Sequence, residues 1–519
     1  MRNINLRYVD EAYDADGMLC RFDVKAPEDF NFAYDVVDDI AVNDPGRTAM
    51  VWCNPEGEHH VFTFADMKTW SDKTASFLAG LGIGRGDYVM VILRRHYQFW
   101  FTALALAKLG AVMVPATFML KEHDLTYRLN GADIKAVICT SAGDIADVVD
   151  AAAPSCPSVE TLVLVNPAGA GLTARDAEGR LIVDDGELVG PALSGEGGIC
   201  AASASRPGWH DFNTGVCLAS PDFARRETRR DDPMLMYFSS GTTGNPKAVE
   251  HNFAHPLGHI ITAKYWQQVQ EDKLHMSVTD SGWAKFGWGK IYGQWIAGAT
   301  IFAYDMDKFV PAKLLQKIQD YKLTTFCAPP TMYRFMLQED VAAYDLSSVE
   351  NFATAGEPLN AEVTIQWEKL TGKKIREGFG QTEGPVLLAT FPWIEPRPGS
   401  MGKPSPLLNV KLLDDDGEEV ADGEEGAICV TGLKESYPPG LFVGYYGNPE
   451  RTEEALGGEY YNLHDMAWRD SDGYCFFVGR NDDVIKCSGY RIGPFEVESA
   501  LVEHPAAVEC AVTAAPDPI

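Results

Sequence analysis

The sequence has few basic residues for its length. Of 519 residues, 44 are lysine or arginine and 74 are aspartate or glutamate, so the formal net charge at pH 7 is −30. Nucleic acids and anionic lipid surfaces are themselves polyanions, and this charge balance argues against both as partners. Any anionic small molecule must therefore be bound by a local group of cations.

The sequence also lacks paired cysteines and long apolar segments. Its 11 cysteines contain no Cys-x-x-Cys pair and are odd in number, which predicts reduced thiols rather than a disulfide framework or a zinc site. No run of about 18 apolar residues is present, so we expect no membrane span. The first residues carry acids and no apolar core, unlike a secretory or mitochondrial targeting segment. Together these features predict a cytoplasmic protein without a membrane partner.

Apolar runs alternate with helical patterns over most of the chain. The spacing predicts a helix over 64–79, a strand over 88–93 and a helix over 97–109 that ends at Gly110. Such alternation is typical of an α/β fold, in which helices cover both faces of a largely parallel sheet. A composition of 46% hydrophobic and 23% charged residues fits a soluble globular protein.

Two segments depart from this pattern. From Leu408 onward the apolar runs become short, with strands predicted over 410–413 and 427–430, which indicates antiparallel hairpins or a small barrel. The segment 166–230 is rich in Gly, Ala and Asp and shows little periodicity. We expect it to be a surface excursion with little structure of its own.

A loop of hydroxyls and glycines follows a predicted strand in the middle of the chain. The apolar run 234–238 leads directly into Ser239-Ser-Gly-Thr-Thr-Gly-Asn-Pro-Lys247. Glycines let the backbone approach an anion, loop N–H groups and hydroxyls donate to phosphate oxygens, and Lys247 adds a mobile cation. The stretch lacks the Gly-Lys-Ser/Thr ending of a Walker loop. A Ser/Gly linker has a similar composition, but a linker rarely follows a buried strand directly.

This loop closely resembles the phosphate loop of the adenylate-forming superfamily, which includes acyl-CoA synthetases, peptide-synthetase adenylation domains and luciferases. Further segments resemble the family's motifs and follow in its order: Ala355-Gly-Glu-Pro358, Gly378-Phe-Gly-Gln-Thr-Glu383, Asp465, Gly479–Lys486 and Ser488–Gly493. The resemblance extends from about Phe62 to the last residue. It is nearest to medium-chain acyl-CoA synthetases, with acetyl-CoA synthetases further away.

The resemblance implies a domain organisation. A large N-terminal domain over 1–481 is expected, built from two α/β sheet layers and a small β-barrel subdomain over 408–481. A hinge at Asp482 would lead into a mobile α+β C-terminal domain over 482–519. The family's C-terminal domain is longer and contains a late lysine that is not among these residues, so the domain is expected to be truncated here.

The resemblance also implies the chemistry. A carboxylic acid would attack ATP to form an acyl-adenylate and pyrophosphate, and the thiol of CoA would then displace AMP. No protein nucleophile is needed, so the protein positions the reactants and stabilises their charge. Mg²⁺ would pair with the phosphates through few protein carboxylates. ATP, CoA, Mg²⁺ and a small carboxylic acid are therefore the expected ligands; the sequence leaves the oligomeric state open.

The motifs assign candidate residues to these ligands. The positions implied to act in catalysis are Lys247, Thr382, Glu383 and Arg491, with Glu383 also holding the metal. The positions implied to bind the nucleotide and CoA are Ser239, Ser240, Gly241, Thr242, Thr243, Gly244, Gly356, Glu357, Pro358, Phe379, Gly380, Gln381, Asp465, Arg480 and Gly489. Taken alone, Glu383 could equally be a surface acid and Phe379 a core residue. The family usually has Thr-Gly-Asp where this chain has Leu463-His464-Asp465.

The acyl pocket is implied to be lined by Trp283, Ala284, Lys285, Trp288, Ala355 and Gly380. Acetyl-specific relatives carry a tryptophan at the position of Gly380, so glycine there predicts room for a medium-chain, branched or aromatic acid. A lysine beside an apolar tail is costly unless it is paired or reaches solvent. Lys285 therefore shortens the tunnel, meets a polar group of the substrate, or points elsewhere.

Other functions share the same motifs. An adenylation enzyme that loads a carrier protein and an acetyl- or propionyl-CoA synthetase are the alternatives within the superfamily. A catalytically idle nucleotide-binding module is the alternative outside it. Enzymes that load amino acids place an acid for the substrate ammonium, and the segment 281–288 offers none, which favours CoA as the acceptor.

Overall fold

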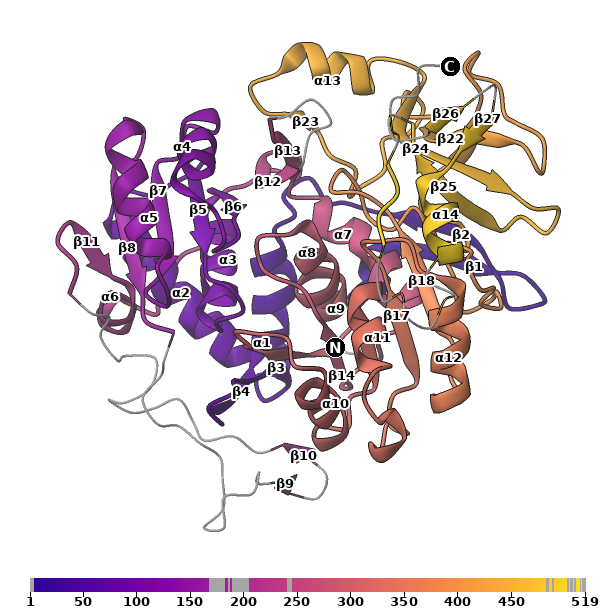
Figure 1. Cartoon of the computed structure of the whole chain (residues 1–519). Helices are drawn as coiled ribbons and strands as arrows, with labels where there is room; N and C mark the ends of the chain where they lie inside the picture. Colours follow the sequence, from indigo (N-terminus) through magenta and orange to yellow (C-terminus); the bar gives the residue numbers. More distant parts are fainter. Residues whose placement is uncertain are drawn as a thin grey trace.

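The computed structural model is a mixed α/β protein, as the sequence predicts (Figure 1). It describes residues 4–167, 183–184, 187–188, 205–239, 245–481, 485–487, 490–501, 504, 507, 510–513 and 515. Two large sheets with helices form the body, and a smaller antiparallel sheet lies beyond them toward the C-terminus. An antiparallel N-terminal hairpin of β1 (Val9–Tyr13) and β2 (Leu19–Val24) precedes the body.

The first large sheet carries the predicted phosphate loop. Its strands lie in the order β11-β8-β7-β5-β6-β12-β13-β23, parallel from β11 to β12 and antiparallel beyond. The strands are β5 (Tyr88–Ile92), β6 (Val112–Pro115), β7 (Ala136–Thr140), β8 (Thr161–Val165), β11 (Trp209–Asp211), β12 (Pro233–Ser239), β13 (Lys247–Asn252) and β23 (Gly444–Tyr445). The phosphate-loop segment thus connects two antiparallel strands, with Ser239 paired to Lys247.

Local signals fix the helices between residues 64 and 260, several of which pack directly on this sheet. These helices are α2 (Phe64–Gly80), α3 (Gln98–Leu109), α4 (Glu122–Gly131), α5 (Ile145–Ala152), α6 (Phe212–Leu218) and α7 (His255–Ile260). Thr63 and Asp66 form a reciprocal capping box at the start of α2. Gly110 ends α3 with a φ of 72°, a left-handed conformation that costs glycine little.

The second large sheet supplies the opposite wall of the body. Its order is β20-β19-β18-β17-β16-β14-β15-β3-β4, parallel from β18 to β3. The strands are β3 (Thr48–Cys53), β4 (His59–Thr63), β14 (Leu274–Ser277), β15 (Thr300–Tyr304), β16 (Thr325–Ala328), β17 (Asn351–Thr354), β18 (Ile375–Phe379), β19 (Leu388–Ala389) and β20 (Lys403–Pro404). Its helices are α8 (Ala284–Lys290), α9 (Tyr292–Ile296), α10 (Pro311–Asp320), α11 (Pro330–Met336) and α12 (Ala361–Thr371).

One apolar core joins the two sheets. Trp100 of α3 donates its indole N–H to the carbonyl of Lys290 at the end of α8, at 2.8 Å. Trp295 of α9 is fully buried in the same cluster, so it is a core residue rather than a pocket residue. The two sheets therefore form one rigid support for whatever binds at their edges.

The β-rich subdomain is a four-stranded antiparallel sheet. Its order is β21 (Val410–Leu413), β22 (Glu425–Thr431), β24 (Tyr460–Arg469) and β25 (Cys475–Arg480). Helix α13 (Pro449–Leu456) crosses above β13 and β23 (Figure 1). The chain continues into β26 (Ile485–Cys487), β27 (Tyr490–Ile492) and α14 (Pro494–Leu501). The predicted hinge residue Asp482 lies outside the described residues.

The structure corrects two expectations. The segment 166–230 is not devoid of structure, because β11 extends the first sheet through β8 and α6 follows at once. Cys217 in α6 is disulfide-bonded, although reduced cysteines were expected; most of the other described cysteines are free and buried. Along the described part of the chain, no helix combines the length and apolarity needed to cross a bilayer.

Candidate active site

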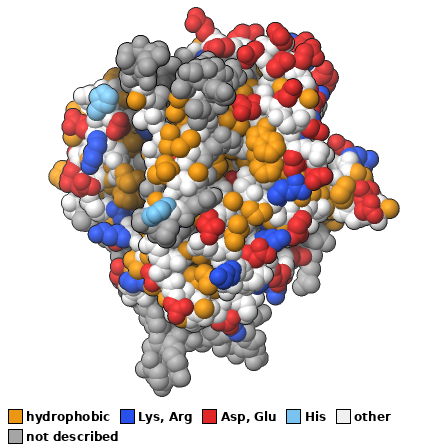
Figure 2. Space-filling model, turned by 45° about the vertical axis from the view of Figure 1, so that its right-hand side comes forward, with side chains coloured by type: hydrophobic (Ala, Val, Ile, Leu, Met, Phe, Trp, Pro, Cys, Tyr) orange, Lys and Arg blue, Asp and Glu red, His pale blue; other side chains and the backbone are white. Residues whose placement is uncertain are grey.

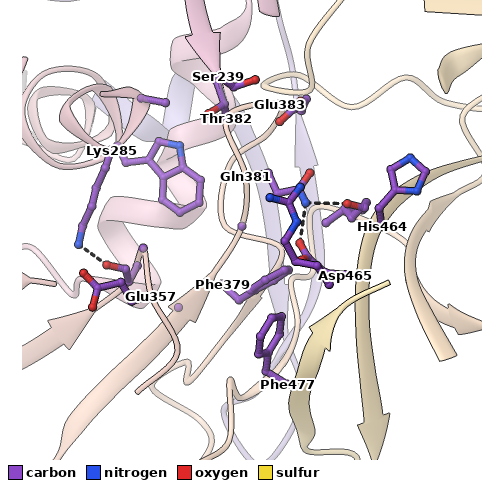
Figure 3. Close-up of a pocket in the computed structure, with 18 of the residues that line it drawn as sticks. Ser239, Lys285, Glu357, Phe379, Gln381, Thr382, Glu383, His464, Asp465 and Phe477 are labelled. Atoms are coloured by element: carbon purple, nitrogen blue, oxygen red, sulfur yellow. Dashed lines mark hydrogen bonds between the residues drawn. The ribbon is translucent and has the colours of Figure 1, made fainter. Parts of the chain in front are cut away.

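A cavity of about 570 Å³ lies where the two large sheets meet the β-rich subdomain (Figure 3). Ser239 ends β12, Ala355 follows β17 and Phe379 ends β18, so three strands deliver residues from their carboxyl ends. Ligands of α/β proteins typically bind at this edge of a sheet. The subdomain closes the opposite side with Asp465 and Arg480.

The phosphate end of the cavity is built around Glu383. This carboxylate is only 6% exposed and accepts a hydrogen bond from the Tyr445 hydroxyl at 3.2 Å. Burial raises its pKa, and the nearby cation of Lys247 opposes that rise. Lys247 also lies 5.6 Å from the centre of the Tyr445 ring. The cation, the phenol and the carboxylate therefore form one connected group at the position predicted for the phosphates.

Three buried histidines support the loop that carries Thr382 and Glu383. His251 donates from Nε2 to the Thr382 carbonyl at 2.9 Å, and its ring centre lies 4.1 Å from that of His255. His255 contacts the carbonyl of Gly440 through Nδ1 at 3.2 Å, so Nδ1 carries its proton. Burial lowers the pKa of each histidine, to about 4 for His255. The support is therefore neutral.

The remaining protons of this cluster follow from that assignment. The Nε2 of His255 must accept, so His259 donates to it from Nε2 at 3.1 Å. Nδ1 of His259 then accepts from the Thr262 hydroxyl at 3.2 Å. Thr262 in turn accepts from the N–H of Val386 at 3.5 Å. The cluster thus holds the loop at Thr382 and again at Val386.

Gln381 organises the predicted ribose end. Its amide nitrogen donates to the Asp465 carboxylate at 2.6 Å and to the Leu463 carbonyl at 2.8 Å, as the dashed lines in Figure 3 show. Tyr461 donates to the amide oxygen of Gln381 at 3.2 Å. Asp465 is 7% exposed and pairs with Arg480 across β24 and β25. An aspartate in this position is held ready to accept hydrogen bonds from the hydroxyl groups of a ligand.

His464 occupies the turn position where the family usually has glycine. The family's usual glycine is absent here, yet His464 adopts φ of 62°, in the left-handed region that glycine favours. The turn is secured because the His464 N–H donates to Asn462 Oδ1 at 2.7 Å, and its carbonyl accepts from Asn481 at 2.9 Å. A histidine can therefore replace the glycine without displacing Asp465.

A flat slot lies beside the ribose end. The rings of Phe379 and Phe477 lie 6.2 Å apart, and Figure 3 shows both on one side of the cavity. Gly356 has a φ of 102° and lines the slot with Pro358 and Glu357. The Glu357 carboxylate is occupied elsewhere, since it accepts from the Thr331 hydroxyl at 2.6 Å.

The acyl end is narrower than the sequence predicted. A Cβ added at Gly380 would overlap Cη2 of Trp288 and lie 3.0 Å from Leu387 Cδ1. Gly380 therefore does not open a tunnel by itself, because the Trp288 indole already fills the space beside it. Lys285 lines the same end, but its Nζ donates to the Ala355 carbonyl, and burial lowers its pKa. Trp283 is 57% exposed, and Ala284 follows it in the lining.

Comparison with known proteins identifies the group to which this site belongs. Residues 37–446 match the model of the AMP-binding enzyme family. The chain belongs to that family. It is 36% identical over 505 residues to acyl-coenzyme A synthetase ACSM3, mitochondrial, of Mus musculus, covering 96% of this chain and 80% of that protein. It is also 36% identical over 500 residues to acyl-coenzyme A synthetase ACSM5, mitochondrial, of Homo sapiens, covering 95% and 79%.

A solved structure agrees. The anthranilate CoA ligase AuaEII, in complex with anthranoyl-AMP, superposes with a TM-score of 0.80 at 26% identity, covering 95% of this chain and 86% of that one. The protein is thus an AMP-forming acyl-CoA synthetase that uses ATP and CoA, and the carrier-loading alternative is not favoured. The predicted superfamily and α/β fold class are confirmed.

Some predicted positions of this acyl-CoA synthetase cannot be placed. Ser240, Gly241, Thr242, Thr243, Gly244 and Gly489 lie outside the described residues, as does the side chain of Arg491. All other predicted nucleotide and acyl positions line the single cavity.

The cavity also includes residues that motif reasoning missed. These are Glu377, Met401, Tyr445, Arg451, Tyr461 and Phe477. Glu377 directly precedes a recognised motif and could have been included with it. Met401 lies just before β20, and the others lie within 408–481. No local pattern there separates a lining residue from a structural one.

Proposed function

We propose that this acyl-CoA synthetase activates a branched, aromatic or medium-chain carboxylic acid. The main observation behind this proposal is that four features line one cavity. They are Asp465 at the predicted ribose end, the aromatic ring of Phe379, the cation of Lys247 at the predicted phosphate end, and the indole of Trp288 at the acyl end. In the first step a carboxylate oxygen bonds to the α-phosphorus of ATP, the bond to the β-phosphate oxygen breaks, and pyrophosphate leaves with the electron pair. In the second, the CoA sulfur bonds to the acyl carbon, the bond from that carbon to the phosphate oxygen of AMP breaks, AMP leaves with the electron pair, and the thiol proton passes to solvent.

Residue roles follow the layout of the cavity. Asp465 and Arg480 would hold the ribose, and Phe379 would pack on the adenine. Lys247 and Thr382 would bind phosphate oxygens, which stabilises the charge that develops as pyrophosphate departs. The acid would lie against Trp288.

Mg²⁺ would fit at Glu383. This buried carboxylate faces the phosphate end, and no group of three or more His, Cys, Asp or Glu side chains in the described residues is placed to hold a metal alone. Glu383 would therefore bind the ion together with the phosphates, as Mg²⁺ commonly binds. The ion would neutralise phosphate charge. The protein's own part is to orient Glu383 through the Tyr445 hydroxyl, while the Lys247 cation opposes the rise in the pKa of Glu383 that burial causes.

The acid preference favours compact tails. Trp288 is 5% exposed and its ring lies against Gly380, so a long straight chain has no path at that point. A branched or ring-bearing tail can instead pack on the face of the indole, where burying each methylene is worth about 0.8 kcal/mol. Acetate would make less of this contact and should be a poorer substrate.

The decisive experiment measures pyrophosphate release with a panel of acids, with and without CoA. We expect release to depend on the acid, and thioester to form only when CoA is present. Asp465→Ala should weaken AMP and ATP binding equally, by about 1–3 kcal/mol, because both carry the ribose. Unchanged affinity for both nucleotides would show that Asp465 is not at the ribose.

A further inference from the structure

Arg451 is a cation of the cavity that no motif identified. It is the third residue of α13, and its N–H donates to Asn448 Oδ1 at 3.0 Å, which fixes the start of the helix. Helix α13 lies above β13 and β23 (Figure 1). Arg451 is one of the residues that line the cavity. None of the ion pairs among the described residues includes Arg451, whereas Lys411 and Arg469 of the same subdomain both pair with Glu419. Its charge is thus not neutralised within the described chain.

The surroundings of Arg451 place it at the phosphate end. Its guanidinium carbon lies 5.4 Å from the centre of the Tyr445 ring, and Lys247 Nζ lies 5.6 Å from the same centre. The hydroxyl of that ring contacts Glu383. Two cations and the metal-binding candidate therefore surround one tyrosine, whereas Asp465 and Phe379 lie toward the ribose and adenine ends.

We propose that Arg451 binds the β- and γ-phosphates of ATP and holds the pyrophosphate as it leaves. The inference rests on the adenylation chemistry above. When the α–β bridge breaks, its electron pair stays on the pyrophosphate, so negative charge grows where Lys247 and Arg451 converge. A guanidinium presents several donors in a plane and suits adjacent phosphate oxygens. With a net charge of −30 and acidic side chains spread over the surface (Figure 2), the protein depends on such local cations.

This role separates ligands that contain the β-phosphate from those that do not. In Arg451→Gln, the KM for ATP, and the KM for pyrophosphate in pyrophosphate–ATP exchange, should rise about 10- to 100-fold, the loss expected for a charge-assisted hydrogen bond. The dissociation constant of AMP and the rate of thioester formation from preformed acyl-adenylate should stay within about two-fold. Arg451→Lys should recover part of the pyrophosphate affinity, because it keeps the charge but not the planar donors.

Lys434→Gln is the matched control. Lys434 lies exposed in the same subdomain, and its loss changes the net charge equally. This variant should leave the KM for pyrophosphate unchanged, which excludes a long-range charge effect.

Three results would overturn the proposal. If the KM for pyrophosphate does not rise in Arg451→Gln, Arg451 does not contact the pyrophosphate. If AMP affinity falls as much as pyrophosphate affinity, the substitution disturbs the whole site. A rise in the KM for CoA alone would assign Arg451 to the thiol substrate. If Arg451→Gln does not fold, an unchanged KM for pyrophosphate in Arg451→Lys refutes it instead. Failure of the adenylation assignment itself is distinct, since wild type would then show no acid-dependent exchange.

Discussion

Replacing Trp288 with alanine should shift the preference of the enzyme, within the proposed range of acids, from compact tails toward longer straight tails. The indole is 5% exposed and stands in the space that glycine leaves at position 380. Its removal joins that space to the cavity. Four further methylenes of a substrate could then be buried, at about 0.8 kcal/mol each, or about 3 kcal/mol. At about 1.4 kcal/mol per factor of ten, the kcat/KM ratio of octanoate to butyrate should rise about 200-fold.

The measurement is a competition between acids, read as acyl-CoA products. Trp288→Ala also creates a cavity and should lower the free energy of unfolding by about 3–5 kcal/mol, so thermal unfolding is measured in parallel. Trp468→Ala is the matched control, because that tryptophan stacks on Phe476 and is not part of the cavity lining. Gly380→Ala should impair all acids by clashing with the indole. Trp288→Ala should relieve this only in part in the double variant, because the added Cβ would also lie 2.9 Å from the Pro385 carbonyl oxygen. If the ranking of acids survives Trp288→Ala, the indole does not limit chain length.

Two further variants should change the pH dependence of stability in opposite directions. His60 is buried against Trp52, and both of its ring nitrogens lack a hydrogen-bond partner. Burial lowers its pKa to about 4, so the unfolded chain binds a proton at a higher pH than the folded chain does. The free energy of unfolding therefore decreases as pH falls below 6.5. His60→Phe should remove about 2 kcal/mol of this loss at about pH 5, and thermal unfolding that stays parallel to wild type would contradict it. Burial raises the pKa of Glu377 to about 8, so the folded chain keeps a proton that the unfolded chain releases above pH 4.5. The free energy of unfolding therefore decreases as pH rises from 4.5 toward 8. Glu377→Gln should recover about 3 kcal/mol near pH 7, and no gain over wild type there would show that the carboxyl is not buried in solution.

Strand β12 and the other parallel strands could be predicted because their signals are local. An apolar run followed by hydroxyls and glycines fixes β12 and its exit without knowledge of distant contacts. The same holds for α3, which ends at Gly110 as the sequence indicated.

The acyl wall could not be predicted from one position. Gly380 indicates an open tunnel only if nothing else fills the space, and Trp288 lies almost a hundred residues earlier in the chain. Arg451 was missed for a related reason, because a solvent-side arginine and a ligand-binding arginine look alike in a helix pattern. The position of Arg451 next to the Tyr445 ring identifies it as a cavity residue, and only the tertiary structure shows this contact.

The neutral histidine cluster has a consequence for turnover. His251, His255 and His259 hold the loop under the phosphates with fixed, uncharged tautomers. If these histidines were imidazolium ions, their fixed positive charge would remain beside the pyrophosphate after it has formed. That charge would slow the dissociation of pyrophosphate. Positive charge at this end instead resides on Lys247 and Arg451, which line the cavity from β13 and α13. The histidine cluster therefore makes the loop rigid without adding positive charge that would hold the product. Release of pyrophosphate then need not be the slowest step of turnover.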